Sequence, residues 1–497
     1  MTTSNEQINP EQTIKDATTN KWHPLFKLGI TALGLSLFFI VGFITGRYSE
    51  KWIQPISTTP TQQLTQEDIN AFQRLYGTIQ ANYIEEIDKN QLLEGAMSGM
   101  VNALGDPYSE FLNASQSEVF DEAVTGSFQG IGVEIVSKDG QIMIVSPIDD
   151  TPAEKAGLKA NDIILAADGT ELNDMSTHEV VQLIRGEKGT SVELKIKRAD
   201  TTFDVTVDRA EIPIISVKAE LDEEDPTVGM IRVSQFAGNT YDQLVESIKQ
   251  LKKEGATSFV FDFRSNPGGL LDQAMKISNI FLEEGQTIFQ IEEANGQIES
   301  SKATKALGDF KMADPYVVLV DEGSASASEI FAGAIQQNTE HQVVGTKTFG
   351  KGTVQTMAAE NEYGELKLTI AKWLTPNGTW IHQEGIEPDV EVDNDPVAHA
   401  LFLNDEEVYQ KGDYGEFVDT IIMILNALDY SVEEANTFDE TVEKQVKAFQ
   451  KDHDLEQTGQ VTGETARQLM EETRNYLQAN DVQYKKALEV LKESKSE

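Results

Sequence analysis

Three serines stand at alternate positions in the stretch VDEGSASASEIFAGAIQQ, where an apolar run gives way to a helical pattern. They are Ser324, Ser326 and Ser328, and each can be the nucleophile of a hydrolase or only the small residue that a tight turn needs. Ser326 and Glu329 have the S-x-x-E spacing of a capping box, which would make Ser326 a helix N-cap. The same helix end offers free N–H groups that stabilise a developing oxyanion, so the residues alone leave both roles open.

A serine nucleophile needs a base, and the sequence offers no histidine in a fitting motif. The chain has no cysteine and six histidines, and it contains neither a GNSGG-like nor a G-x-S-x-G stretch. We therefore expect a lysine to remove the serine proton, which it can do only in its neutral form. The histidines that supply no general base are His23, His178, His341, His382, His399 and His453.

A competing interpretation concerns the stretch GTKTFGKG, residues 345–352, which follows the phosphate-binding pattern G-x-x-x-x-G-K. The next residue of that pattern holds Mg²⁺ through a hydroxyl group, but here it is Gly352. The residues that follow, TVQTMAAENEYGELKLTIAKW, predict a strand and a turn and not the helix whose N-terminus would hold phosphate. We therefore exclude a nucleotide-hydrolysing enzyme.

Composition excludes further classes of protein. The chain has 497 residues, of which 83 are acidic and 40 are basic, giving a formal net charge of −43. A nucleic-acid partner is not expected, because affinity for phosphates comes mainly from Lys and Arg. The absence of cysteine excludes disulfides and thiolate metal sites, and we expect no metal or organic cofactor. The length predicts about three or four domains.

Residues 28–46, LGITALGLSLFFIVGFITG, form a 19-residue run without a charge. Such a run is long enough to cross a bilayer core of about 30 Å as a helix. A cleaved signal peptide is the alternative, but its apolar region would be only about 7–15 residues long, and no A-x-A-like cleavage site follows. We therefore expect an uncleaved single-pass anchor, with a cytoplasmic tail at 1–27 and a linker at 47–64.

Four successive patterns follow the linker, and together they predict a multidomain α/β and α+β protein. Residues 65–122 have apolar positions at helical spacing, and residues 123–212 predict short strands around one capped helix, STHEVVQLIRG. Residues 213–404 alternate β-rich runs with helices, which predicts an α/β core. Residues 405–472 predict a helical bundle, and residues 473–497 a C-terminal helix. The expected strands of the second pattern span 131–136, 142–146, 163–167, 191–198 and 202–209.

The second pattern resembles a PDZ domain, which captures peptide C-termini by adding them as a strand to a sheet edge. The resemblance rests on GSFQGIGVEI and SPIDDTPAEKAGLKANDIILAADG. It implies that N–H groups around Gly130 and Gly132 bind a carboxylate. The alternative is a small β-domain in which these glycines only serve a bulge. The expected peptide-binding residues are Gly130, Ile131, Gly132, Val133 and Arg185, the last as a contact between the PDZ helix and the protease body.

Five further motifs resemble the carboxyl-terminal processing proteases, which are membrane-associated serine peptidases with an embedded PDZ domain. These motifs are, in order, LLEGAMSGMVNALGDPYSEF, FDFRSNPGGLLDQA, VDEGSASASEIFAGAIQ, GTKTFGKGTVQ and TPNGTWIHQEGIEPDV. The resemblance implies a Ser/Lys dyad with Ser326 as nucleophile, Lys351 as base and Gln355 as the supporting residue. Burial would keep Lys351 neutral, and the N–H groups of Gly268 and Ala327 are the expected oxyanion hole.

Residues 415–470 resemble the small helical peptidoglycan-binding domain of cell-wall enzymes. The resemblance rests on LNALDY, FDETVEKQVKAFQ and LEQTGQVTGET. It implies a peptidoglycan partner, whereas a three-helix bundle that binds nothing has the same apolar pattern. Asp429 stands where a glycine is common, which makes glycan affinity a weaker expectation than the fold.

Together these resemblances imply a membrane-anchored extracytoplasmic endopeptidase that engages polypeptides near their C-termini and is gated by its PDZ domain. The partners would be polypeptide substrates, peptidoglycan and the cell membrane, and a homodimer stays open. The alternative is a non-catalytic scaffold that binds C-termini and cell wall. A trypsin-like protease with a PDZ domain would need a His/Asp/Ser set, which cannot be assembled from these motifs.

Overall fold

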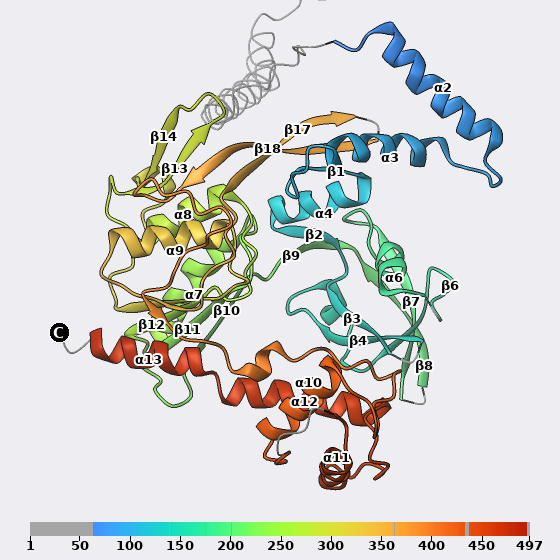
Figure 1. The fold of residues 1–497 in the computed structure, drawn as a ribbon, viewed down its shortest axis with the longest axis vertical. Helices are drawn as coiled ribbons and strands as arrows, with labels where there is room; N and C mark the ends of the chain where they lie inside the picture. The colour runs from blue at the N-terminus through green and yellow to red at the C-terminus, as the bar shows by residue number, and fades with distance from the viewer. Residues whose placement is uncertain are drawn as a thin grey trace, which may run out of the picture. The chain divides into compact units, whose positions relative to one another are not determined.

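The computed structural model describes residues 63–494 except residues 139, 174, 200, 362 and 433–436 (Figure 1). The expected cytoplasmic tail, transmembrane helix at 28–46 and nearly all of the linker lie outside these residues. Within the described ranges, no helix is both long and apolar enough to span a bilayer. The chain divides into two compact units at Leu92.

The first unit contributes helix α2 (Gln66–Asn82), which begins at a capping box between Thr65 and Asp68. None of its residues is buried, and its apolar side chains at Ile69, Phe72 and Leu75 are exposed. Helix α3 (Lys89–Asn102) begins at the end of this unit and continues into the second. Helices α2 and α3 agree with the helical spacing of apolar residues noted over 65–122.

The β-rich segment is a mixed α+β module whose strands pair in the order β3-β4-β5-β7-β8, with β6 beside β5. Strand β3 begins at Val133, two residues later than expected, and Gly130 instead ends strand β2. Strand β2 pairs with β9, so the chain enters and leaves the module on two adjacent strands. The capping box of Ser176 and Glu179 at the start of α6 is confirmed. The elements are β2 (Ser127–Gly130), β3 (Val133–Lys138), β4 (Gln141–Pro147), α5 (Pro152–Lys155), β5 (Ile163–Ala167), β6 (Thr170–Glu171), α6 (Thr177–Ile184), β7 (Ser191–Arg198), β8 (Thr201–Asp208) and β9 (Ala210–Pro213).

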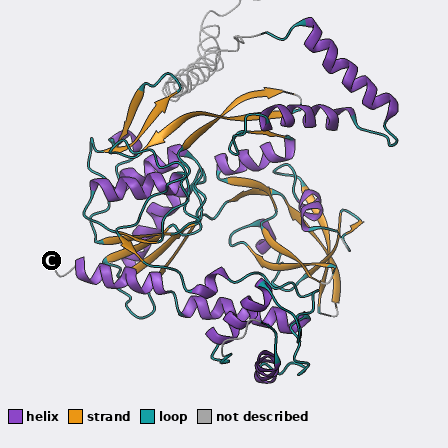
Figure 2. Cartoon of the chain, viewed as in Figure 1, coloured by secondary structure: helices purple, strands orange, loops and turns teal. Residues whose placement is uncertain are grey.

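The α/β core is built on a six-stranded sheet in the order β10-β11-β12-β15-β16-β19, in which only the β10–β11 pair is antiparallel. Strands β12 and β15 are buried along their whole length, as expected for apolar runs in a parallel sheet. Figure 2 shows helices and strands alternating through this part of the chain. The strands are β10 (Val217–Leu221), β11 (Val228–Val233), β12 (Ser258–Asp262), β15 (Tyr316–Val320), β16 (Val343–Gly345) and β19 (Val390–Glu391).

Alternate side chains of this sheet belong to two different hydrophobic clusters. One face packs against α7 (Thr240–Glu254), α8 (Leu271–Phe281) and α9 (Ala327–Asn338). The other face packs against α13 (Val482–Ser494), at the end of the described chain. The C-terminal helix is therefore part of the protease core.

A second sheet in the order β1-β18-β13-β14 carries the hairpin of β17 and β18. This hairpin confirms the strand and turn expected after Lys351. Helix α4 follows β1 and precedes β2 in the chain, and it contacts β1, β2 and β18. The elements are β1 (Glu110–Leu112), α4 (Ala114–Thr125), β13 (Thr287–Glu293), β14 (Ile298–Lys302), the 3-10 helix η1 (Lys305–Leu307), β17 (Thr353–Asn361) and β18 (Gly364–Leu374).

The C-terminal module has its own core, formed by η2 (Pro396–His399), α10 (Glu416–Ala427), α11 (Glu440–Asp452) and α12 (Gly463–Ala479). The expected boundary at residue 472 falls inside α12, because this helix runs without a break to Ala479. Asp429 adopts a left-handed conformation with φ of 66°, which explains why glycine suits that position.

Candidate active site

Ser326 stands at the junction of a buried strand and a helix. Strand β15 ends at Val320, and α9 begins directly after Ser326, which is its N-cap. The capping box expected between Ser326 and Glu329 is confirmed. Ser326 has a φ of 56°, a conformation that costs a non-glycine residue on the order of 1–3 kcal/mol and occurs mainly at functional sites. The serine is partly exposed, while its neighbours in the turn are buried.

Ser324 and Ser328 are fully buried and serve the turn. The hydroxyl of Ser324 donates to the carbonyl oxygen of Phe263 at 2.9 Å and accepts from the N–H of Asp321 at 2.9 Å. The hydroxyl of Ser328 donates to the carbonyl oxygen of Asn266 at 2.9 Å. Of the three alternating serines, Ser326 alone lines the cavity described below.

Glu329 joins the serine turn to the loop that carries the lysine. Its carboxylate is fully buried and accepts from the N–H groups of Ser326 at 2.7 Å, Gly350 at 2.7 Å and Lys351 at 2.8 Å. The hydroxyl of Thr348 donates to it at 2.7 Å. One side chain thus fixes both predicted catalytic segments.

Lys351 is half-buried above the ring of Tyr108, whose centroid lies 4.9 Å from Nζ. Burial lowers the pKa of Lys351 below its ordinary value, and the positive charge of Lys367 lowers it further. The carboxylates of Asp106 and Glu329 act in the opposite direction, but the net shift is downward. The environment therefore favours the neutral amine that a general base requires.

Gln355 differs from its expected arrangement. Its amide nitrogen donates to the hydroxyl groups of Thr353 at 3.0 Å and Thr369 at 3.1 Å, and no hydrogen bond joins it to Lys351 among the described residues. The N–H of Thr369 donates to Ser109 Oγ at 3.0 Å, and Ser109 in turn donates to Asp106 at 2.6 Å. These contacts hold the amide nitrogen of Gln355 against Thr353 of β17 and Thr369 of β18, and an interaction of its oxygen with Lys351 stays a prediction.

The two expected oxyanion donors lie against each other. Gly268 has a φ of 98°, and a Cβ added there would come within 2.9 Å of both Ala327 N and Ser326 Cβ. Only glycine fits this approach. The N–H of Ala327 has no acceptor among the described residues, whereas the N–H of Gly268 donates to Asn266 Oδ1 at 2.9 Å. Gly268 would therefore have to release Asn266 before it could bind an oxyanion.

One cavity of about 410 Å³ brings all five expected residues together. Its wall includes Ser326, Ala327, Gly268, Lys351 and Gln355. No group of three or more His, Asp or Glu side chains in the described ranges could hold a metal ion. A serine hydroxyl and a lysine of lowered pKa in one cavity are the groups that acyl transfer with a lysine base requires, although no hydrogen bond joins Ser326 to Lys351 among the described residues.

Of the expected peptide-binding residues, Gly132 and Val133 lie at the start of an edge strand, whereas Gly130 is paired with Ala210 in the separate β2–β9 sheet. Strand β3 is an edge strand, and Val133 is its first residue. Gly132 has a φ of 83° and packs against Thr151, where a Cβ would clash at 2.4 Å. Ile131 is buried, and its carbonyl oxygen accepts from the N–H of Ala153 at 2.9 Å. The edge of β3 is thus open to an added strand.

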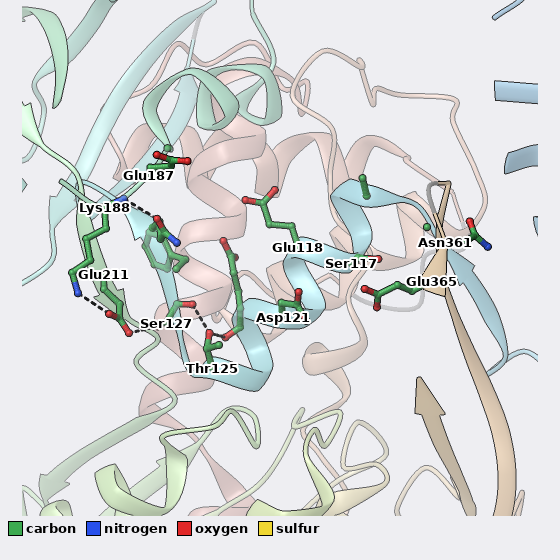
Figure 3. A pocket seen from close by; sticks show the side chains of 16 residues that line it. Ser117, Glu118, Asp121, Thr125, Ser127, Glu187, Lys188, Glu211, Asn361 and Glu365 are labelled. Atoms are coloured by element: carbon green, nitrogen blue, oxygen red, sulfur yellow. Dashed lines mark hydrogen bonds and ion pairs between the residues drawn. The ribbon is translucent and has the colours of Figure 1, made fainter. Parts of the chain in front are cut away.

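Arg185 ends helix α6 and reaches out of this module. Its guanidinium forms an ion pair with Glu122 of α4 at 2.5 Å and lies 4.9 Å from the ring centroid of Phe128. Arg185 therefore contacts α4 and not the expected protease core at 213–404, and α4 in turn contacts β18 of that core. A separate cavity of about 810 Å³ lies between these parts, and Figure 3 shows Glu118, Asp121, Glu187 and Glu365 around it.

Comparison with protein-family models matches residues 227–392 to "Peptidase family S41" and residues 143–198 to "PDZ domain". Residues 33–116 match "Activating protease CtpB N-terminal domain", and residues 414–469 match "Putative peptidoglycan binding domain". The "Carboxy-terminal processing protease CtpA" of Bacillus subtilis (strain 168) is 39% identical over 470 residues, which are 92% of this chain and 98% of that protein. The chain belongs to the carboxyl-terminal processing proteases of peptidase family S41.

Other carboxyl-terminal processing proteases are similar as well. The "Probable CtpA-like serine protease" of Staphylococcus aureus (strain COL) is 37% identical over 428 residues, 86% of each chain. The solved "Photosystem II D1 C-terminal processing protease" is 28% identical, covering 65% of this chain and 87% of its own, with a TM-score of 0.37. The PDZ domain of a carboxy-terminal protease from Vibrio cholerae, solved with a peptide, is 28% identical over 17% of this chain and 97% of its own, with a TM-score of 0.17. The expected family, fold class and serine-type peptidase activity are confirmed.

This carboxyl-terminal processing protease has further residues beside Lys351 that the sequence analysis did not assign to the site. Tyr108 contacts Lys351, and the ring of His382 meets Tyr108 edge to face at 6.0 Å and stacks on Trp380 at 5.1 Å. The N–H of Gly352 also approaches His382 Nδ1 at 3.4 Å. Both Tyr108 and His382 stand inside motifs quoted above, GDPYSEF and GTWIHQEG, which was the signal available in the sequence.

Proposed function

We propose that this chain is a membrane-anchored, extracytoplasmic serine endopeptidase that cleaves polypeptides engaged near their C-termini through a Ser326/Lys351 dyad. The observation that carries the proposal is the shared cavity. A serine in a strained turn at a helix N-terminus and a lysine whose pKa is lowered by burial line the same 410 Å³ space.

The reaction would begin with transfer of the Ser326 hydroxyl proton to the neutral Nζ of Lys351 as Oγ attacks the substrate carbonyl carbon. The resulting oxyanion would be held by the N–H of Ala327, and by that of Gly268 once it releases Asn266. Lys351 would then give its proton to the departing amine, leaving an acyl-enzyme on Ser326. Water, deprotonated by the same lysine, would release the acid and regenerate the serine.

A serine-reactive phosphonate tests the proposal directly. We expect the probe to label purified protein at a single site and to abolish its cleavage of an unstructured test protein. Mass spectrometry should map the adduct to the tryptic peptide that contains Ser326. Folded protein that does not react with the phosphonate, or an adduct on another serine, would favour the non-catalytic scaffold and contradict the dyad.

The two connections of the PDZ domain to the core support gating by this domain. Strands β2 and β9 pair along the entry and exit of the domain, and Gly130 is the partner of Ala210. The ion pair of Arg185 with Glu122 joins the domain to α4, whose residues Phe120 and Ala123 line the catalytic cavity. A peptide added to β3 could thereby change the cavity through α4.

Excision of the PDZ domain is expected to change regulation without removing the dyad. Residues 131–209 would be replaced by a two-residue turn joining Gly130 to Ala210, which are already paired. The variant should lose preference for particular substrate C-termini, because the β3 edge is gone, while phosphonate labelling persists. Cleavage rates would be compared on substrates that differ only in their last three residues. An unchanged rate together with an unchanged preference would contradict gating.

Anchoring is proposed from the apolar run at residues 28–46, with the catalytic part outside the cytoplasm. The 39% identical Bacillus subtilis relative and the family match over residues 33–116 support a common arrangement of this end of the chain. Full-length protein should sediment with membranes and be digested by protease added outside the cell. A variant lacking residues 1–62 should stay in the supernatant, and its retention in membranes would contradict the anchor.

Two further partners are proposed. The match of residues 414–469 to a peptidoglycan-binding family supports binding to cell wall, to be measured as co-sedimentation with purified peptidoglycan.

The exposed apolar side chains of α2 at Ile69, Phe72 and Leu75 support a homodimer. Replacing these three by serine should convert a dimer to a monomer in light scattering. A wild-type protein that is monomeric at all concentrations would contradict this.

A further inference from the structure

The C-terminal helix α13 belongs physically to the protease core and not to the module that precedes it. Its residues Ala487, Val490 and Leu491 share a hydrophobic cluster with Val260 of β12 and Leu319 of β15. These two strands end in the segments that carry the Gly268 turn and the Ser326 turn. The last helix of the chain therefore lies against the strands that lead to both segments of the site (Figure 1).

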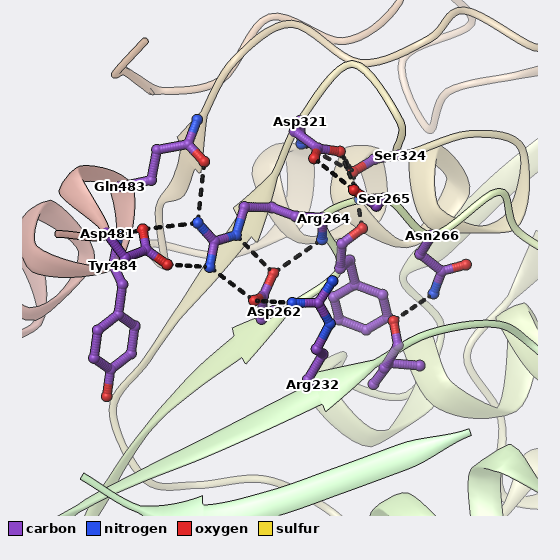
Figure 4. Close-up of polar contacts among 12 residues, drawn as sticks. Arg232, Asp262, Arg264, Ser265, Asn266, Asp321, Ser324, Asp481, Gln483 and Tyr484 are labelled. Carbon is purple, nitrogen blue, oxygen red and sulfur yellow. Dashed lines mark hydrogen bonds and ion pairs between the residues drawn. The ribbon is translucent and has the colours of Figure 1, made fainter. Parts of the chain in front are cut away.

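Arg264 connects α13 to the Gly268 turn. It lies two residues beyond the end of β12, and its guanidinium is held between Asp262 and the first turn of α13 (Figure 4). Asp262 accepts from Nε at 2.9 Å and from Nη2 at 2.8 Å. Asp481 accepts from Nη1 at 2.8 Å and from Nη2 at 2.7 Å, and Gln483 Oε1 accepts from Nη1 at 3.2 Å. These five bonds use all five N–H donors of the guanidinium.

The charges of this cluster depend on one another. The side chain of Asp262 is fully buried, that of Arg264 is 12% exposed and that of Asp481 is 27% exposed. Arg232 adds a more distant contact to Asp262 at 3.8 Å. Because a buried guanidinium is costly unless each donor is satisfied, removal of the Asp481 side chain would leave Arg264 without two of its five hydrogen bonds.

The residues that follow Arg264 hold the serine turn. The N–H of Ser265 donates to Asp321 Oδ1 at 2.7 Å, and the carbonyl oxygen of Asn266 accepts from the N–H of Ala325 at 2.9 Å. Figure 4 shows Ser265, Asp321 and Ser324 meeting beside Arg264. The hydrogen bonds of Arg264 and those of the two residues that follow it in the chain thus connect α13 to the residues that flank Ser326.

The turn itself is strained and has to be held by its surroundings. Ser265 has a φ of 56°, which is strained for a residue with a side chain, whereas Gly268 adopts its φ of 98° without that penalty. Such a strained conformation persists only where neighbouring contacts over-determine it. Arg264, immediately before Ser265, provides that support at the strand end.

We propose that Asp481 is a positioning residue for the Gly268 turn, acting through Arg264, so that the start of α13 is part of the catalytic unit. The inference rests on the proposed function, in which this turn contributes to the oxyanion hole. It assigns a catalytic contribution to a residue that lies beyond the peptidoglycan-binding-like module, 155 positions after Ser326 in the sequence.

The test compares Asp481→Asn with Asp439→Asn. Both aspartates cap a helix, since Asp481 Oδ1 accepts from Tyr484 N–H at 2.8 Å and Asp439 Oδ1 accepts from Thr441 N–H at 2.7 Å. Asparagine caps about as well as aspartate, so both variants keep the cap and lose one negative charge. Of these two aspartates, only Asp481 contacts Arg264. Phosphonate titration gives the concentration of active sites, so that kcat is calculated per active site. We expect Asp481→Asn to lower kcat about tenfold, which is less than the decrease of about 10²–10³-fold on removal of an oxyanion-hole donor. KM should stay within about twofold.

A second measurement separates the oxyanion site from general stability. A peptide aldehyde forms a tetrahedral adduct with the serine, whereas the product peptide acid of the same sequence does not. Asp481→Asn should weaken the aldehyde about tenfold and leave the product peptide unchanged. If Asp481→Asn fails to fold, Asp481→Glu, which keeps the charge but displaces the carboxylate by one methylene, should give a smaller loss of the same kind.

The outcomes distinguish this inference from the proposed function. Equal kcat and equal aldehyde affinity in Asp481→Asn and the Asp439→Asn control would overturn the positioning role. So would a loss of activity that is explained entirely by a smaller number of active sites that react with the phosphonate. Cleavage that survives in Ser326→Ala protein would instead overturn the dyad. A tenfold loss confined to kcat and to the aldehyde supports the role of Asp481.

Discussion

Ser326→Ala protein is expected to lose peptide cleavage by a factor on the order of 10⁴ or more, because Ser326 is the only serine among the described residues that line the cavity. The fold should survive. The N–H of residue 326 still donates to Glu329, and its carbonyl oxygen still accepts from Ile330 at 2.9 Å. Cleavage of an unstructured protein by the purified variant is the measurement, with thermal unfolding to show that the variant is folded.

Ser324→Ala and Ser328→Ala are the matched controls in the same turn. Both serines are fully buried, so their loss should appear mainly in stability. Ser324→Ala leaves the N–H of Asp321 without its hydroxyl partner and should cost about 1–3 kcal/mol. Ser328→Ala should cost about 1 kcal/mol, since Asn266 keeps the N–H of Ala325 as donor. Both should retain much of their activity per folded molecule. Full activity in Ser326→Ala, or none in folded Ser328→Ala, would contradict the assignment of the nucleophile.

Lys351→Arg is expected to reduce activity by about 10²–10⁴-fold, the usual contribution of a general base. Arginine keeps the positive charge at every accessible pH, so it cannot accept the proton of Ser326. Lys351→Met, with a neutral side chain of similar length, should be equally inactive. The rate of phosphonate labelling measures the loss at the first chemical step, and substantial activity in Lys351→Arg would exclude the lysine base.

The pH profile of the wild-type protein gives a second measure of the same residue. Activity requires neutral Lys351, so it should rise with pH through the lowered pKa of this lysine and then hold into alkaline conditions. Lys367→Gln removes the positive charge that lowers this pKa, and it should move the rising limb to higher pH. Lys372→Gln is the control and should leave the limb in place, because Lys372 lies on the same strand and is likewise ion-paired, but it does not shift the pKa of Lys351. A limb that moves to lower pH in Lys367→Gln would be inconsistent with this electrostatic account.

Gln355→Glu should also move the limb to higher pH, because a carboxylate would favour the charged lysine. Gln355→Ala should mainly slow turnover. The structure adds a reason for the amide, since Gln355 can donate to Thr353 and Thr369 through nitrogen while its oxygen stays free for Lys351.

Local patterns made much of the fold predictable. The capping spacings at Ser176 and Ser326 predicted helix starts that the structure confirms, and unbroken apolar runs predicted the buried strands β12 and β15. Spacing within one segment is a property of the residues themselves. Strand ends were less predictable, because β3 begins only where Val133 can pair with Pro147.

The missing parts of the site depend on contacts between distant segments. Tyr108 reaches Lys351 because β1 pairs with β18, so that a loop more than two hundred residues earlier is brought to the lysine. Arg264 meets Asp481 only because α13 returns to the sheet after a separate module. No periodicity in the sequence predicts contacts between segments so far apart. Nothing in the sequence distinguishes Asp262 and Asp481 from ordinary surface carboxylates.

The shared carboxylate of Glu329 has a consequence for how this enzyme can be silenced. Because it receives N–H groups from Ser326, Gly350 and Lys351 at once, it ties the proposed nucleophile and the proposed base together. In an inactive form that separates Ser326 from Lys351, the buried Glu329 carboxylate would lose some of its hydrogen-bond donors, at a cost comparable to local unfolding. Latency is therefore expected to work by obstruction of the cavity, with the chemical machinery kept assembled, so that release of an obstacle is enough to start proteolysis.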